Sequence, residues 1–360
     1  MSKMKTCIII PTIRDFKQWK VYRDNFKNYG HDYDVLIIGE LDNYNEKNIP
    51  EGEFWGVRER EKWFNEKGLG AWFDVIPERC HAETSFGIIL AYSRKVYDMV
   101  VMIDDDTLPR DNVDFLGTHW ENLNSESADV VNSTSNWLNS IDPYNTLYYP
   151  RGFPYHKRLN SHFGNCKSEI VKEKRIFSPG SVVISQGLWQ EIPDFNGLDY
   201  LNWNVKDICV PIDFVAEKGN WLTVCSMNLA FRPEVAPAFY QLPMNQHGID
   251  RFDDIWSGLF VKKVCDTLGK YVITGNPLCD HHKFTRNIFN DIRMELKGLE
   301  INEKLYLELE RIELTSENYL DLYEELSNKI VPTNFEGHEE YLSFLKEKML
   351  KWCKIFRKIS

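Results

Sequence analysis

Three consecutive carboxylates are the first candidates for chemistry in this sequence. Asp104, Asp105 and Asp106 directly follow the apolar run of residues 100–103. A short apolar run that ends at a polar break is typical of a buried strand, and open α/β sheets bind ligands at the C-terminal ends of their strands. Adjacent carboxylates repel one another, and a bound cation would offset this repulsion. Oxygen ligands suit Mg²⁺ or Mn²⁺, which also bridge to substrate phosphates. A solvated acidic turn is the alternative, since Pro109 follows, but the position after a strand favours a metal site.

Two arginines lie in or near an aromatic segment that is flanked by prolines. Arg151 lies within residues 148–155, and Arg158 follows it closely. The planar guanidinium group matches the geometry of carboxylate and phosphate oxyanions. We therefore expect a rigidly held arginine that faces a substrate or its phosphates. The alternative is a packed arginine stacked on tyrosine.

Further polar residues stand in apolar or aromatic surroundings. Asn228 interrupts an apolar run, and a buried asparagine must be hydrogen-bonded, so it either ties down a loop or faces a ligand. Asp253 and Asp254 follow Arg251 at the expected start of a helix. They are either charges matched to the helix dipole or the acid/base pair of a sugar site, with Trp256 as a stacking platform.

Two adjacent histidines form the last candidate cluster. His281 and His282 stand between Asp280 and Lys283, after the strand-like run of residues 271–273. A single histidine is most often structural, but a tandem pair beside an acid favours a ligand cluster. We expect one or both histidines to contribute to the metal site.

Alternating apolar runs and amphipathic segments are expected to position these residues. We expect strands at residues 7–10, 35–38, 73–76 and 100–103, and helices from residue 15 onward and at residues 58–65, 85–97, 185–189 and 253–268. Strands alternating with helices are typical of a doubly wound α/β layer. From about residue 287 the composition shifts to Glu, Lys and Leu at helical spacing, which predicts a C-terminal helical region.

The phosphate-binding loops of other α/β proteins are missing from this sequence. The glycines form neither a Gly-x-Gly-x-x-Gly turn after the first strand nor a Gly-x-x-x-x-Gly-Lys-Ser/Thr loop. An α/β layer that has a strand-end acidic triplet but neither loop favours a nucleotide-sugar transferase. In such an enzyme a metal neutralises the diphosphate.

The amino-acid composition limits the kinds of partner that the protein can bind and indicates its cellular compartment. The net charge of −11 over 360 residues argues against general nucleic-acid binding, which needs a basic surface. Eight scattered cysteines without a Cys-x-x-Cys pair argue against a zinc cluster, and the N-terminus has no signal-peptide pattern. No apolar run approaches the ~20 residues of a membrane span. We expect a reduced, cytoplasmic chain.

The last segment is a basic amphipathic helix. Its apolar face comprises Leu342, Leu345, Met349, Trp352, Cys353, Phe356 and Ile359. Lysines and arginines surround this face, although the rest of the chain is acidic. Such a helix can lie on an anionic membrane surface, which would make the protein peripheral to a membrane. The slightly favoured alternative is a terminal helix docked on its own domain or on a second subunit.

Six motifs in order resemble one known family. They lie at residues 10–14 (IPTIR), 103–106 (IDDD), 151–154 (RGFP), 185–189 (SQGLW), 227–231 (MNLAF) and 251–256 (RFDDIW). The chain resembles the reversibly glycosylated polypeptide family, which includes the UDP-arabinopyranose mutases, over about residues 5–300. The resemblance implies a GT-A-type nucleotide-sugar fold, a UDP-sugar substrate, Mn²⁺ or Mg²⁺, and transient attachment of the sugar to the arginine that corresponds to Arg151. It also implies a second functional arginine at Arg158.

These observations lead to one prediction for the fold and one for the site. We expect a GT-A-like, Rossmann-type α/β domain with a mixed, mainly parallel sheet over residues 1–290, and a helical region over residues 291–360. The expected metal ligands are Asp104, Asp105, Asp106, His281 and His282, and the expected catalytic residues are Arg151, Arg158, Asp253 and Asp254. The expected substrate-binding residues are Pro11, Thr12, Arg14, Glu40, Asp104, Asn228, Arg251, Trp256 and Lys283.

For function, we expect a metal-dependent enzyme that interconverts pyranose and furanose forms of a UDP-sugar. An inverting or self-glycosylating glycosyltransferase that uses the same donor is the first alternative. A non-catalytic sugar-nucleotide-binding protein is the second, and the intact acidic triplet counts against it. A homo-oligomer is compatible with the sequence, and a nucleic-acid partner is not expected.

Overall fold

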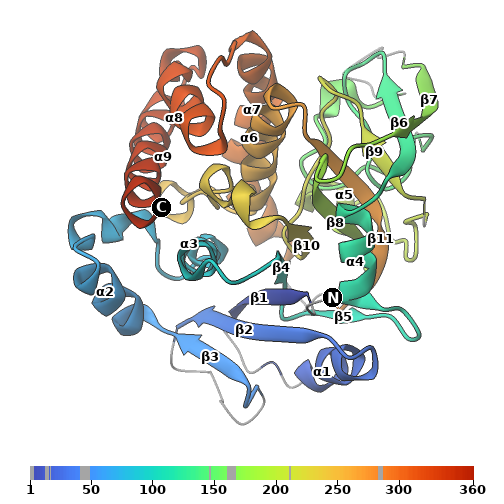
Figure 1. The fold of residues 1–360 in the computed structure, drawn as a ribbon. Coiled ribbons are helices and arrows are strands. Elements are labelled where there is room, and N and C mark those ends of the chain that lie inside the picture. Colours follow the sequence, from blue (N-terminus) through green and yellow to red (C-terminus); the bar gives the residue numbers. More distant parts are fainter. Residues whose placement is uncertain are drawn as a thin grey trace.

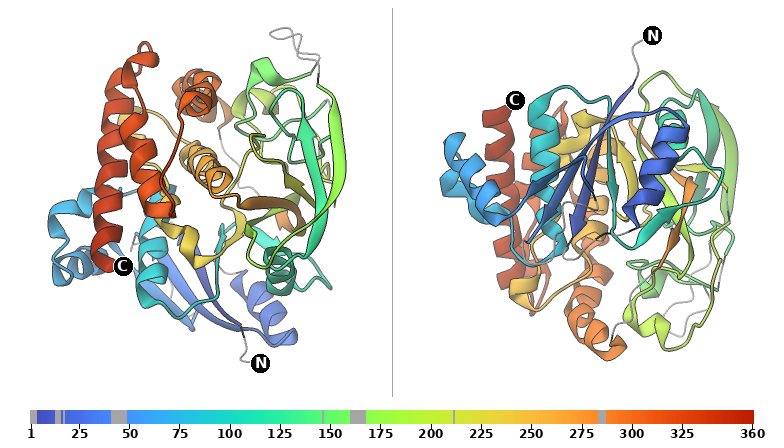
Figure 2. Two further views of the ribbon diagram at one scale, coloured as in Figure 1. Left: turned by 45° about the horizontal axis from the view of Figure 1, so that its top comes forward. Right: turned by 90° about the horizontal axis from the view of Figure 1, so that it is seen from below.

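A mixed sheet forms the centre of the molecule, with helices around it (Figures 1 and 2). The computed structural model describes residues 4–12, 16, 18–40, 49–145, 147–159, 168–210, 212–282 and 287–360. Its strands, as far as these residues show, are β1 (Lys5–Thr12), β2 (Asp32–Gly39), β3 (Gly52–Trp55), β4 (Met99–Ile103), β5 (Thr107–Pro109), β6 (Ser127–Ser133), β7 (Ile170–Ile176), β8 (Val182–Glu191), β9 (Phe214–Ala216), β10 (Asn228–Phe231) and β11 (Tyr271–His281). They follow the order β3-β2-β1-β4-β10-β8-β11-β9-β6-β7, and β5 pairs with β11.

The helices are distributed along the whole chain. The α-helices of the described residues are α1 (Trp19–Asn28), α2 (Val57–Glu66), α3 (Thr84–Arg94), α4 (Phe115–Leu123), α5 (Gly197–Tyr200), α6 (Asp253–Thr267), α7 (Ile288–Arg311), α8 (Tyr319–Lys329) and α9 (Glu339–Ile359). Parallel pairings involve more residues of the sheet than antiparallel pairings do. The prediction of an α/β fold with a mixed, mainly parallel sheet is therefore confirmed.

The order of the first four strands creates a crevice at the carboxyl ends of β1 and β4. Strand β1 pairs in parallel with β2 on one side and with β4 on the other, so the strand order reverses at β1. Open α/β sheets bind ligands outside the carboxyl ends of strands at such a reversal. Thr12 ends β1 here, and Asp104 follows β4. Helix α3 packs closely on these strands because Gly87 has no side chain: a Cβ at Gly87 would lie 2.5 Å from Ile9 Cγ2.

The second half of the sheet brings distant segments to the same crevice. Strand β10 runs antiparallel to β4 and to β8, and β8 in turn pairs in parallel with β11. The Asp104 amide donates to the Met227 carbonyl oxygen over 3.2 Å, which fixes the turn after β4 against the residue before β10. The end of β11, with His281, therefore lies near the acidic triplet.

The C-terminal helices pack together beside α6 (Figures 1 and 2). Their buried side chains belong to the same hydrophobic cluster as the sheet residues. Helix α7 begins at Ile288, close to the expected start of the helical region. The division of the chain at residue 290 stays a prediction, because the shared cluster gives no separate core for either part.

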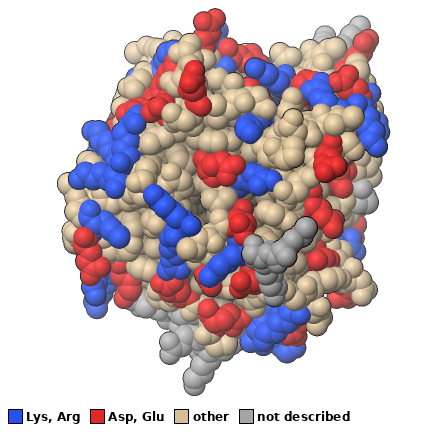
Figure 3. All heavy atoms as spheres, in the orientation of Figure 1, with Lys and Arg blue, Asp and Glu red and all other residues tan. Residues whose placement is uncertain are grey.

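The apolar face of α9 is docked on the rest of the chain. The Trp352 ring stacks on Tyr240, with centroids 4.7 Å apart, and its indole nitrogen donates to the Pro237 carbonyl oxygen over 2.9 Å. Leu342, Met349 and Phe356 are also fully buried. Basic side chains gather at the left edge of the face in Figure 3, where Figure 1 shows α9 and α2. Of the two alternatives for this helix, the structure shows the docked one, and the apolar residues that would contact lipid are covered by protein.

Most expected elements are present, and two are wrong. The expected strands at residues 7–10, 35–38 and 100–103 correspond to β1, β2 and β4, and the helices at 58–65, 85–97 and 253–268 correspond to α2, α3 and α6. Residues 73–76 do not form a strand: residues 73–75 end a 3₁₀ helix, Gly70–Val75, that packs on α2, and Ile76 follows it. The sheet edge is occupied by β3 instead, a strand of only 4 residues, which is too short to show a clear apolar pattern. Residues 185–189 lie in the buried strand β8, because pairing with β10 and β11 overrides their weak helical preference.

Among the described residues, none of the helices combines the length and the apolar character that crossing a membrane requires.

Candidate functional site

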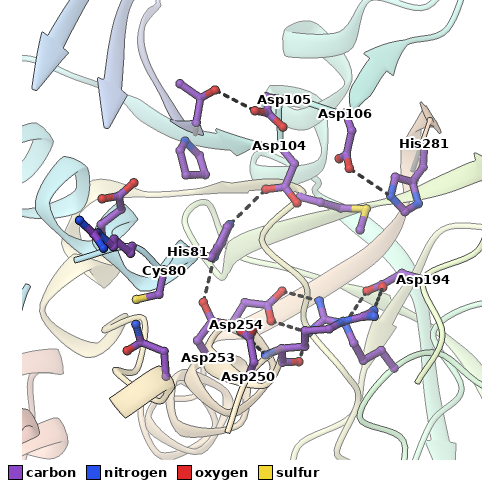
Figure 4. Close-up of a pocket in the computed structure, with 18 residues that line it drawn as sticks. Cys80, His81, Asp104, Asp105, Asp106, Asp194, Asp250, Asp253, Asp254 and His281 are labelled. Atoms are coloured by element: carbon purple, nitrogen blue, oxygen red, sulfur yellow. Dashed lines mark hydrogen bonds and ion pairs between the residues drawn. The ribbon is translucent and has the colours of Figure 1, made fainter. Parts of the chain in front are cut away.

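A cavity of about 280 Å³ opens at the crevice beside β1 and β4 (Figure 4). Eight parts of the chain line it: the end of β1, the segment before α3, the turn after β4, the positions of Arg151, Asp194 and Met227, the segment from 245 to 254 and the end of β11. The lining residues are Pro11, Thr12, Arg79, Cys80, His81, Glu83, Asp104, Asp105, Asp106, Arg151, Asp194, Met227, Asn245, Asp250, Arg251, Asp253, Asp254 and His281. The structure thus gathers many of the predicted site residues around one cavity.

The three carboxylates of the triplet point to three different partners (Figure 4). Asp104 Oδ1 lies 3.1 Å from His81 Nε2, and Asp105 Oδ2 accepts a 2.7 Å hydrogen bond from the Thr12 hydroxyl. Asp106 Oδ2 lies 3.9 Å from His281 Nε2. Their mutual repulsion is thus reduced by divergence and by separate partners. No group of three His, Cys, Asp or Glu side chains in the described ranges is arranged to hold a metal ion.

Asp106 and His281 are the pair that fits a divalent cation. The Ile192 carbonyl oxygen lies 2.7 Å from His281 Nδ1, so Nδ1 carries a hydrogen and Nε2 is the nitrogen that faces Asp106. Metal-binding histidines are commonly oriented by such a bond on the other ring nitrogen. Mn²⁺ accepts imidazole and carboxylate ligands, and Mg²⁺ or Mn²⁺ sites are often completed by water and substrate phosphates. Two protein ligands are therefore compatible with a metal that a diphosphate helps to hold.

His282 differs from its neighbour. Its side chain is exposed, and its backbone amide donates to the Asp106 carbonyl oxygen over 2.7 Å. Its side chain is absent from the cavity lining, so the structure favours His281 of the two histidines. Arg14 and Lys283, two of the predicted substrate-binding residues, lie outside the described residues.

His81 joins the two sides of the cavity, and sequence reasoning missed it. Its Nδ1 lies 2.9 Å from Asp253 Oδ2, and its Nε2 lies 3.1 Å from Asp104 Oδ1 (Figure 4). Burial lowers the pKa of His81, but the Asp253 and Asp104 carboxylates outweigh it and hold the pKa well above its usual value. The ring is therefore an imidazolium that donates to both acids. Nothing in the local sequence marks His81, because its partners come from distant segments.

Arg151 is buried at the cavity wall between two carboxylates. Its Nε donates to Asp194 Oδ2 over 2.8 Å, and its two terminal nitrogens donate to the oxygens of Asp254 over 2.9 and 3.0 Å. Burial lowers the pKa of Arg151, but Asp194 and then Asp254 raise it well above its usual value. Burial raises the pKa of the Asp254 carboxyl, and the Arg151 charge more than reverses that effect. Before any reaction, Arg151 is thus a cation and Asp254 an anion at neutral pH. Sequence reasoning missed Asp194, whose neighbours carry no motif.

Arg158 is held elsewhere. Its two terminal nitrogens donate to the Asp199 carboxylate over 2.7 and 2.9 Å, and its guanidinium carbon lies 3.8 Å from the centre of the Tyr155 ring. Its side chain is buried and does not belong to the cavity lining. The packed arginine stacked on tyrosine, which was the alternative considered for these arginines, describes Arg158.

Two other predicted residues, Asn228 and Trp256, do not line the cavity. Asn228 is buried in a polar network, where its amide nitrogen donates to the carbonyl oxygens of Leu188 and Pro277 over 3.1 and 2.8 Å. It therefore ties β10 to the strands β8 and β11, a structural role within the sheet and neither of the two predicted roles, a fastened loop or a ligand contact. Trp256 is fully buried in the core, and its indole nitrogen donates to the Asn302 side chain over 3.0 Å. This position takes the ring away from a stacking role in the cavity.

Glu40 lies just beyond the cavity lining. Its Oε1 accepts a 2.7 Å hydrogen bond from the backbone amide of Arg79, and Arg79 itself lines the cavity. Arg79 has a positive φ of 57°, which is uncommon for arginine. Glu40 thus holds the turn that carries Arg79, and it acts on the cavity through that turn.

Comparisons with known proteins agree with the motifs. The chain is 28% identical to UDP-arabinopyranose mutase 1 of Arabidopsis thaliana, in an alignment that covers 98% of this chain and 92% of the relative. It is 27% identical to a probable UDP-arabinopyranose mutase 2 of Solanum tuberosum, with 98% and 90% covered. A solved structure, described as a crystal structure of a mycobacterial protein, aligns with a TM-score of 0.41 at 10% identity and covers 84% of this chain and 74% of that one.

A family model described as reversibly glycosylated polypeptide matches residues 175–360. This range is more than half of the chain and contains Asp194, Arg251, Asp253, Asp254 and His281 of the cavity lining. The cavity, the motifs and the match point the same way: the chain belongs to the reversibly glycosylated polypeptide family.

Proposed function

We propose that this protein is a metal-dependent mutase that interconverts the pyranose and furanose forms of a UDP-sugar. Two relatives that match nearly the whole chain are named UDP-arabinopyranose mutases. The observation that carries the proposal is the placement of the Arg151–Asp254 pair and the Asp106–His281 pair in the walls of one cavity. The Arg151–Asp254 pair suits contact with a sugar, and the Asp106–His281 pair suits a metal that binds a diphosphate.

In this proposal one side of the cavity binds the diphosphate and the other side binds the sugar. On the strand-end side, Asp106 and His281 would hold Mn²⁺ or Mg²⁺, which stabilises the charge of a diphosphate. On the other side, Arg151 faces the space for the sugar, where Asp253 and Asp250 offer acceptors for hydroxyl groups. For a mutase, the diphosphate must stay bound while the sugar ring opens and closes again. The site must therefore also keep water away from the sugar.

Arg151 is the residue that we propose to carry the sugar. In this step the bond from the anomeric carbon to the diphosphate oxygen breaks, and a bond to a guanidino nitrogen of Arg151 forms. The proton lost by that nitrogen passes to Asp254, whose oxygens lie 2.9 and 3.0 Å from the two terminal nitrogens. The ring opens and recloses before the diphosphate oxygen recaptures the anomeric carbon and Asp254 returns the proton.

The test is turnover of UDP-arabinopyranose with Mn²⁺, followed by separation of the pyranose and furanose products. We expect furanose product from the wild type, and a loss of at least about 100-fold in Arg151→Lys, because an ammonium group cannot pair with both Asp254 oxygens and Asp194. Arg175→Lys is the matched control, since Arg175 lies on strand β7 and pairs with Glu217, away from the cavity.

The outcomes separate the proposal from its alternatives. Sugar that appears only on an added glycan would indicate a glycosyltransferase, and binding without any product would indicate a sugar-nucleotide-binding protein. Radioactive sugar should label the wild type and not Arg151→Lys. Persistent labelling of Arg151→Ala would show that the sugar is attached elsewhere.

A further inference from the structure

Arg251 lines the cavity, but its side chain is already occupied by protein groups. One terminal nitrogen lies 3.2 Å from Asp194 Oδ1 and 3.1 Å from the Phe195 carbonyl oxygen. The other lies 3.2 Å from Asp291 Oδ2, and Nε lies 3.1 Å from Glu295 Oε1. The side chain is only 9% exposed. The two terminal nitrogens thus donate hydrogen bonds to protein groups and Nε forms an ion pair, which argues against the predicted role as a substrate ligand.

The backbone of Arg251 contacts Arg151 directly. Its carbonyl oxygen accepts a hydrogen bond from a terminal nitrogen of Arg151, the same nitrogen that donates to Asp254. Arg251 has a φ of +66°, in the left-handed region that arginine rarely adopts. Uncommon backbone conformations of this kind persist where the surroundings enforce them, and they concentrate at functional sites.

Asp194 lies between the two arginines and binds both. One of its oxygens accepts from Arg151 Nε over 2.8 Å, and the other lies 3.2 Å from Arg251. Arg151 therefore meets Arg251 twice, once through the shared carboxylate and once through the Arg251 carbonyl oxygen. The two positively charged side chains can lie close together because the negative charge of Asp194 between them offsets their repulsion.

Helix α7 supplies the acids on the far side of Arg251. Asp291 and Glu295 project from its first turns, and neither belongs to the cavity lining. Glu295 Oε2 also accepts from the Gly197 amide over 2.5 Å, and the Met294 carbonyl oxygen accepts from the Asp250 amide over 3.1 Å. The turn at residues 250–251 is therefore fastened to the C-terminal helical region.

We propose that Arg251 is a positioning residue that orients Arg151, and that α7 thereby belongs to the sugar site of the enzyme. Asp291 and Glu295 fix the Arg251 side chain, Arg251 fixes Asp194 and its own carbonyl oxygen, and these two acceptors fix the guanidinium plane of Arg151. The role in turnover rests on the proposed mutase function. The orientation of Arg151 can be measured without it.

The first test separates positioning from substrate binding. We expect Glu295→Gln and Arg251→Lys to lower kcat by about tenfold or more, while KM for the UDP-sugar and Kd for UDP change less than about twofold. The matched control is Glu308→Gln. Glu308 is another buried glutamate of α7, but it accepts from Val331 and Asn334, away from the cavity. We expect Glu308→Gln to lower the melting temperature and to leave kcat within about twofold of the wild type.

Two results of this test would overturn the inference. A rise in KM or Kd with kcat preserved would make Arg251 a substrate ligand. If Glu295→Gln and Glu308→Gln lose kcat equally, in proportion to their lower melting temperatures, the contacts of Glu295 with Arg251 contribute only to stability.

The second test needs no substrate. The folded protein is treated with phenylglyoxal, which reacts with guanidine groups, and labelling of the Arg151 peptide is followed by mass spectrometry. We expect labelling about fivefold faster or more in Glu295→Gln and Arg251→Lys than in the wild type and in Glu308→Gln. Arg158, which is buried against Asp199, serves as the internal reference within each sample. Unchanged labelling of Arg151 in both variants would overturn the inference even if kcat falls. Faster labelling in a protein that shows no mutase turnover would support the inference and refute only the proposed function.

Discussion

Buried His119 should make the stability of this protein sensitive to mild acid. The ring projects from α4 and is fully buried against β8 and β10, where Nδ1 lies 2.9 Å from the Ser185 hydroxyl and Nε2 lies 2.9 Å from Asn228 Oδ1. The Asn228 amide nitrogen donates to two carbonyl oxygens, so its Oδ1 must accept and His119 Nε2 carries the hydrogen. Burial lowers the pKa of His119 to about 4.

The size and sign of the effect follow from this pKa. A histidine in an unfolded chain titrates near pH 6.5. Between about pH 6.5 and pH 4, His119 therefore binds a proton in the unfolded chain but stays neutral in the folded chain. The stability that neutral His119 contributes is therefore complete above about pH 6.5 and is lost as the pH falls. A difference of about 2.5 pKa units at about 1.36 kcal/mol each corresponds to a loss of about 3 kcal/mol, of which about 2 kcal/mol is lost by pH 5.

The assay compares urea unfolding of the wild type and of His119→Gln near pH 7 and near pH 5. Glutamine is never charged, so the wild type should lose about 2 kcal/mol more than the variant between these pH values. Burial raises the pKa of Glu83 to about 7, which acts in the opposite direction, but this contribution is the same in both proteins and cancels. An equal loss of stability in both proteins would refute the reasoning. His119→Asn provides a second comparison if the glutamine variant does not fold.

Three further predictions concern the metal, the second arginine and the last helix. Asp106→Asn, like excess EDTA, should lower turnover by about 100-fold or more and leave the melting temperature within a few degrees, and full activity in EDTA would exclude the metal role. Arg158→Met should lower the free energy of unfolding by about 3–5 kcal/mol, because it leaves buried Asp199 without its cation, and the Kd for UDP should stay unchanged in calorimetry. Trp352→Ala should cost about 3–5 kcal/mol in urea unfolding, because the ring is fully buried against Tyr240. The full-length protein should stay unbound in flotation with anionic liposomes, and binding at low salt would mean that α9 leaves its docked position.

Local patterns in the sequence determined much of the fold. The apolar run of residues 100–103 predicted β4, and its position directly before the acidic triplet predicted the edge of the sheet where the cavity lies. The spacing of Leu342, Trp352 and Phe356 predicted the buried face of α9. These signals are local because a strand or helix face is defined by residues a few positions apart. The short runs at residues 73–76 and 185–189 misled, since a run of that length does not distinguish strand from helix or turn.

Only the tertiary structure decided which of the charged residues meet. Arg151 pairs with Asp194 and Asp254, which are 43 and 103 positions away, and His81 reaches Asp253 across 172 positions. Such pairs depend on the insertion of β10 between β4 and β8 and on the docking of α7, which no periodicity encodes. The same arrangement sends Arg158 and Trp256 into the protein interior, although Arg158 follows Arg151 closely in the sequence and Trp256 shares a motif with Asp254. The sequence by itself thus determined which chemistry is available, and the fold decided which side chains face the cavity, because a charge acts on groups near it in space and not along the chain.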